Sequence, residues 1–199
     1  MLGKKLHIIF IIFILTPFFC QIMPVKAQFS EGTSLDAVYA LMTESATKGN
    51  YEEISALLPS VSEATNKIKK NFNVDIVSEI RDALVKRDKE KVLSAVNKLI
   101  FYDMKNIFFE ISQMRKASAT PLRMLMKKAY SNYRLLSPEI RSVKSKADDN
   151  IKMLFKQLFS FLAVETSPFA VEKRDVIVDA DAIHSVTVKI EEECLSVLR

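Results

Sequence analysis

The sequence predicts an all-α protein, a single-domain antiparallel bundle of about six helices that follows an N-terminal signal peptide. Apolar residues recur three and four positions apart through most of the chain, a spacing typical of amphipathic helices. Three Gly and six Pro are too few among 199 residues, 49% of them hydrophobic, for a linker-rich or disordered chain. At roughly 100–200 residues per domain, the length suits one domain.

Residues 1–27 have the layout of a secretory signal peptide: two lysines, an apolar run over 6–19, and a polar stretch that ends at Ala27. The run has 14 residues, whereas a membrane-spanning helix needs about 20. We therefore expect cleavage before Gln28 and export to the periplasm or the medium, rather than an uncleaved anchor. A lipoprotein is disfavoured because two bulky Phe precede Cys20, where small residues are required.

Cleavage would lower the formal net charge from +5 to +2 and leave Cys194 as the only thiol. We expect Cys194 to be a buried apolar residue of the last helix; the alternative is an intermolecular disulfide or a reactive thiol. His184 would be the only histidine, so no zinc site of His and Cys ligands can form. Gly32 and Gly49 lie in no phosphate-binding motif. We predict no enzymatic activity and no resident cofactor.

The first helix is expected to begin after a capping Ser34 and to stop at Gly49. The next helical pattern covers 51–72, but Pro59 must kink or divide it. This helix, turn, helix pattern recurs weakly around residue 88, and two hairpins in one bundle explain it as well as a helical repeat does.

Asp75 and Asp88 are the expected caps of a third and a fourth helix. The fourth, over 89–114, is the longest strongly apolar segment and should be central. Two further starts place a hydroxyl residue before a proline, and they predict a fifth helix from Pro121 and an antiparallel sixth from Pro138.

The chain from 175 to 199 is ambiguous. Residues 176–178 suit a short strand, yet the apolar residues from Ile183 to Val197 have helical spacing. We predict an acidic terminal helix, because no second strand candidate exists to pair with the first. The Ser167–Pro168 step before it is expected to be a loop.

The basic residues are concentrated in a predicted helical hairpin over 115–156, which has eleven Lys and Arg against three acids. One interpretation is a solvated face that acidic neighbours such as Glu191 to Glu193 balance; the other is a docking surface for an acidic protein or an anionic membrane. Nucleic acid is not an expected partner of an exported protein. The candidate partner-binding residues are Arg123, Lys127, Arg134, Arg141 and Lys144.

Asp103 falls in the middle of the apolar arc of the fourth helix, with Glu110 two turns further on the same face. A buried carboxylate needs a partner or a raised pKa. We expect a hydrogen bond or ion pair with Arg134 or Tyr130. The functional alternative makes Asp103 and Glu110 oxygen ligands of a metal ion, although the Glu-x-x-His pairs of di-iron bundles are missing.

Met42 and His184 on the first and last helices are a second speculative pair, since four-helix haem cytochromes bind iron through a Met and a His. That similarity concerns architecture alone, and Met at helical spacing is usually core filler. The sequence thus favours an exported, non-enzymatic helical binding or accessory protein. The alternative is a small periplasmic metal- or haem-binding redox protein.

Overall fold

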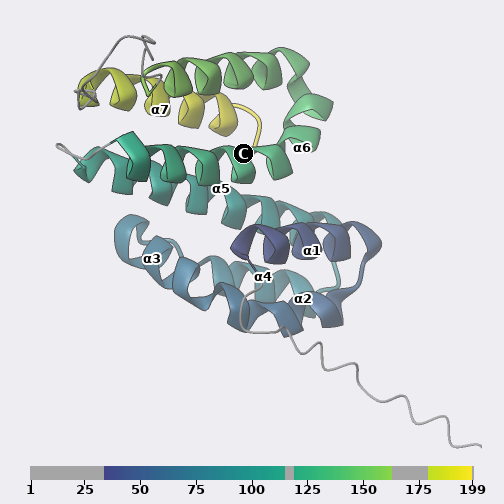
Figure 1. Ribbon diagram of the computed structural model, residues 1–199. Coiled ribbons are helices and arrows are strands. Elements are labelled where there is room, and N and C mark those ends of the chain that lie inside the picture. The colour runs from purple at the N-terminus through teal and green to yellow at the C-terminus, as the bar shows by residue number, and fades with distance from the viewer. Residues whose placement is uncertain (1–33, 115–118, 163–178, 199) are drawn as a thin grey trace, which may run out of the picture.

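The computed structural model describes residues 34–114, 119–162 and 179–198, and these form only helices, packed against one another (Figure 1). The predicted all-α class is confirmed. The signal peptide, the strand candidate at 176–178 and the Ser167–Pro168 step lie outside the described residues. The helices are α1 (Leu35–Lys48), α2 (Tyr51–Leu57), the 3-10 helix η1 (Leu58–Val61), α3 (Ser62–Phe72), α4 (Ile76–Val85), α5 (Lys89–Gln113), α6 (Ala119–Ser160) and α7 (Ala180–Leu195).

The predicted caps are confirmed. The side chains of Ser34, Asp75 and Asp88 accept hydrogen bonds from backbone N–H groups in the first turns of α1, α4 and α5, which satisfies donors that a helix start leaves without partners. Pro59 does divide the second helical pattern. It lies in η1, whose tighter turns join α2 to α3.

The two helix, turn, helix segments adopt the same turn. Gly49 (φ 72°) and Arg87 (φ 48°) each take the left-handed conformation after a helix, and the capping Asn50 and Asp88 follow them. The turns also contact each other, because the hydroxyl of Tyr51 donates to the carbonyl oxygen of Arg87 at 2.9 Å. The weak sequence similarity therefore reflects a shared turn geometry.

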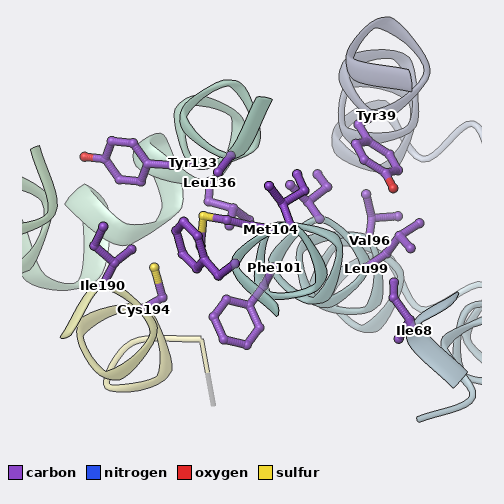
Figure 2. Packing of buried hydrophobic residues seen from close by; sticks show 14 of the residues in the cluster. Tyr39, Ile68, Val96, Leu99, Phe101, Met104, Tyr133, Leu136, Ile190 and Cys194 are labelled. Atoms are coloured by element: carbon purple, nitrogen blue, oxygen red, sulfur yellow. The ribbon is translucent and has the colours of Figure 1, made fainter. Parts of the chain in front are cut away.

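Helix α5 is central, as its apolar composition predicted. Figure 2 shows it between two sets of buried side chains: Tyr39 and Ile68 lie on one side, and Tyr133, Ile190 and Cys194 lie on the other. Helices α1, α3, α4, α6 and α7 all contact it. The core is consequently continuous from α1 to α7.

The predicted boundary between the fifth and sixth helices is wrong. Helical structure runs through Pro138, and the break falls at Lys144, whose φ of −152° and ψ of 85° are not helical. Proline is compatible with the first turn of a helix but does not require one to start there. A first arm (119–143) and a second arm (145–160) result, and the second arm returns along the first (Figure 1).

The predicted terminal helix is confirmed as α7, although it starts at Ala180 rather than at 175. Asp179 caps it by accepting hydrogen bonds from the backbone N–H groups of Asp181 and Ala182. The helix packs against α5 and α6. In the described part of the chain, no helix is both long enough and apolar enough to cross a membrane.

Candidate functional site

Asp103 is buried, as its place in the apolar arc predicted, with 3% of its surface exposed. Its partner is not Arg134 or Tyr130. The amide nitrogen Nδ2 of Asn132, on the first arm of α6, donates to Oδ2 of Asp103 at 2.9 Å. Burial raises the pKa of Asp103, and the bond from Asn132 offsets part of that rise.

Two buried polar atoms at this site, one of them on Asn132 itself, make no hydrogen bond to a described residue. They are the hydroxyl of Tyr39 and Oδ1 of Asn132. Burial raises the pKa of Tyr39 well above its usual value, and the nearby charge of Asp103 raises it further. Helices α1, α5 and α6 thus meet at a small polar cluster inside an apolar core.

Glu110 is engaged separately from Asp103. Nδ2 of Asn106 donates to its Oε1 at 3.1 Å, and Nζ of Lys67 lies 4.0 Å from the same oxygen. Seven residues of helix separate Asp103 from Glu110 by about 10 Å along the axis. Within the ranges that the structure describes, no group of three or more His, Cys, Asp and Glu could hold a metal ion. The two carboxylates therefore do not meet at one site.

Met42 and His184 are also apart. Met42 is fully buried on α1, whereas His184 is exposed on α7. Helix α5 lies between these two helices in Figure 1. The fold does not bring the pair to a common site for haem iron.

Cys194 is a buried free thiol on α7, as we expected of an apolar core residue. Burial raises its pKa to about 12, and the charges of Glu191 and Glu193 contribute. A thiol with that pKa stays protonated at neutral pH and is a poor nucleophile.

The sequence analysis missed the most connected polar residue, Asp148 on the second arm of α6. It is fully buried, and its carboxylate accepts hydrogen bonds from four side chains, those of Tyr133, Ser137, Arg141 and Lys152. Burial opposes its ionisation, yet these donors together hold the pKa of Asp148 far below its usual range. Asp148 lies among the buried apolar residues Ala147 and Ile151 of its helix. A charged residue on an apolar face is the signal that identified Asp103, and it could have identified Asp148 too.

Three of the five predicted partner-binding residues bond within the fold. Arg141 pairs with Asp148 at 2.9 Å, Arg123 donates to the carbonyl oxygen of Leu162 at 2.6 Å, and Nζ of Lys144 lies 3.4 Å from Oγ of Ser196. Lys127 and Arg134 are exposed and form no ion pair with any described residue.

The acidic residues of α7 do not balance these two cations in the described structure. Glu191 pairs with Lys105 of α5 at 3.2 Å. Glu193 accepts a hydrogen bond from Nδ2 of Asn150 at 2.9 Å. Glu191 and Glu193 thus contact Lys105 and Asn150 rather than Lys127 or Arg134.

The two arms of α6 meet along an aromatic contact. Tyr130 packs against Phe155 and Phe159, with ring centroids 5.1 and 6.1 Å apart, and Tyr133 stacks on Phe155 at 5.4 Å. Tyr130 and Phe159 are half-buried. They lie along the line where the two arms touch.

Cations flank this line on its solvent side. At 100° per residue, Arg123, Lys127 and Arg134 lie within about 40° of one another on the first arm, over about 16 Å of helix. Lys152 and Lys156 follow the contact residue Asp148 by one and two turns on the second arm. We call these five cations, with Tyr130 and Phe159, the α6 seam. Lys152 and Lys156 belong to the basic hairpin but were not among the predicted partner-binding residues, because periodicity does not give the register between the two arms.

Comparisons with protein-family models, with curated proteins and with solved structures find no match to this chain.

Proposed function

We propose that this chain is an exported, non-enzymatic helical binding protein that docks an anionic partner through the α6 seam. One observation carries the proposal: Lys127, Arg134 and Lys156 are exposed along one face of a hairpin and pair with no acid of the described structure. On the other helices most lysines do have such a partner, namely Lys48, Lys67, Lys69, Lys91, Lys98 and Lys105.

The polar chemistry that the fold buries supports binding rather than catalysis. Asp148 accepts hydrogen bonds from four side chains, and three of these, Tyr133, Ser137 and Arg141, fasten the first arm to the second. Asp103 accepts a hydrogen bond from the side-chain amide of Asn132 on the facing helix α6. Both carboxylates are hydrogen-bonded inside the fold, which leaves the exposed cations as the groups able to meet a partner. The leader over 1–27 supports export to the periplasm or the medium.

Fractionation of the producing cells, with mass spectrometry of the exported protein, tests the first half of the proposal. We expect an N-terminus near Gln28, and a protein that keeps Met1 in the cytoplasm would contradict export.

Binding is tested with a seam variant, Lys127→Gln/Arg134→Gln/Lys156→Gln. Its matched control is Lys70→Gln/Lys86→Gln/Lys89→Gln, which removes three exposed cations outside α6. Affinity capture from an envelope extract at about 0.05 and about 0.5 M salt should yield an acidic partner that high salt and the seam variant release. Equal capture by both variants would contradict docking at the seam.

A further inference from the structure

We infer that the α6 seam binds an extended, acidic segment of a partner protein, laid along the line where the two arms meet. This inference rests on the proposed function and names the class of its partner.

The arrangement of charge suits a linear anion. Arg123, Lys127 and Arg134 follow the first arm over about 16 Å. On the second arm, Lys152 donates to the same oxygen of Asp148 as Arg141 of the first arm does, and Lys156 follows Lys152 by one turn. Consecutive residues of an extended chain are about 3.3 Å apart, so a segment of about five residues would span the cations of the first arm. Carboxylates on alternate residues would then face them repeatedly.

The kinds of side chain also suit carboxylates. A guanidinium presents a planar fork that bonds both oxygens of a carboxylate, and the seam has one near each end, on Arg123 and Arg134. Arg123 is already oriented by its 2.6 Å bond to the carbonyl oxygen of Leu162. This bond leaves other N–H groups of the same side chain to donate to a ligand.

Tyr130 and Phe159 add an apolar surface beside the cations of the seam. Tyr130 and Phe159 are half-buried, with ring centroids 6.1 Å apart, so part of each ring is open to a ligand that crosses the seam. Covering this surface adds a hydrophobic contribution that salt does not screen. A bound segment should therefore carry apolar side chains between its acids.

An anionic bilayer fits the same surface less well. Peripheral membrane helices add inserted apolar side chains beside their cations. Here the aromatic pair is half-buried, and the exposed Met124 and Met153 lie about 60° around their helices from Lys127 and Lys156.

The test measures fluorescence anisotropy of a labelled peptide of alternating Glu and Leu with the mature protein, the seam variant and the control variant defined above. Circular dichroism first establishes that all three are folded. We expect the seam variant to bind about tenfold or more weakly and the control variant to stay within about twofold of the unmodified protein. A peptide of alternating Gln and Leu should bind about tenfold more weakly than the acidic one.

Three outcomes would overturn the inference. The two variants could bind the acidic peptide equally; phosphatidylglycerol vesicles could bind the mature protein through the seam while the peptide does not; or light scattering could show a dimer that only the seam variant dissociates. If the peptide fails while an acidic partner from the envelope extract still depends on the seam, the proposed function stands and the extended segment is excluded. If that partner also binds the seam variant, both fail.

Discussion

The hydroxyl of Tyr133 lies 2.5 Å from Oδ1 of Asp148 and 2.9 Å from the carbonyl oxygen of the same residue, and so fastens the first arm of α6 to the second. Both residues are buried at the contact between the arms. Together with the bonds from Ser137 and Arg141, this bond fixes the register in which Lys152 meets the carboxylate that also binds Arg141 of the first arm.

Tyr133→Phe should lower the free energy of unfolding by about 1–2 kcal/mol, because it leaves a buried carboxylate with one donor fewer. Urea denaturation measures the change. Tyr102→Phe is the matched control: Tyr102 is half-buried and makes no side-chain hydrogen bond with a described residue, so a change below about 0.5 kcal/mol is expected. Equal effects of the two substitutions would contradict the role of the Tyr133 hydroxyl.

Asp148 should make the fold sensitive to acid. Its donors hold its folded pKa below the unfolded value of about 3.9, so its contribution to stability is complete above that pH and is lost as the pH falls below it. Asp148→Asn should therefore be destabilising at pH ~6 and progressively less so towards pH ~2. Denaturation of both proteins across this range measures the difference, and a difference independent of pH would be the contrary result.

Asp103 should behave in the opposite way. Burial raises its folded pKa above the unfolded value, so its ionisation opposes folding above the folded pKa, and this cost disappears as the pH falls below about 3.9. Asp103→Asn should match or exceed the stability of the unmodified protein at pH ~7, with an advantage that shrinks in acid. A loss above about 2 kcal/mol at pH ~7 would instead show that the ionised carboxylate is required.

The sequence predicted the helix caps and the burial of Asp103, but not the hydrogen-bond partners of the two carboxylates. Helix caps such as Ser34, Asp75 and Asp88 were predicted because capping depends on a few neighbouring residues. The spacing of the apolar residues in 89–114 likewise predicted that Asp103 is buried. It could not identify Asn132 as the partner, since periodicity places a residue on a helix face but does not set the register between helices.

The hairpin was predicted in part for the same reason. Its basic first arm follows from the spacing of Arg123, Lys127 and Arg134, but the turn was placed at Pro138 instead of Lys144. No local rule distinguishes a proline in a first turn from a proline that a helix runs through with a bend. The bonds that Tyr133, Ser137 and Arg141 donate to Asp148 cross the turn and hold the second arm where it lies.

Cys194 should be inert in the folded protein. Its burial and its pKa of about 12 predict that iodoacetamide leaves it unmodified under native conditions and labels it fully in denaturant, as intact mass spectrometry would show. Rapid native labelling, or a disulfide-linked dimer on a non-reducing gel, would support the alternative of a reactive or intermolecular thiol.

Docking at the α6 seam is tested most directly by site-specific photo-crosslinking in the producing cell. A crosslinking residue replaces Ser131, half-exposed between Lys127 and Arg134, and in a control it replaces the exposed Asn66 of α3. We predict an adduct with an acidic protein from position 131 that the seam variant abolishes and the control variant retains. An adduct that survives in the seam variant, or one that forms from position 66 but not from 131, would contradict the account.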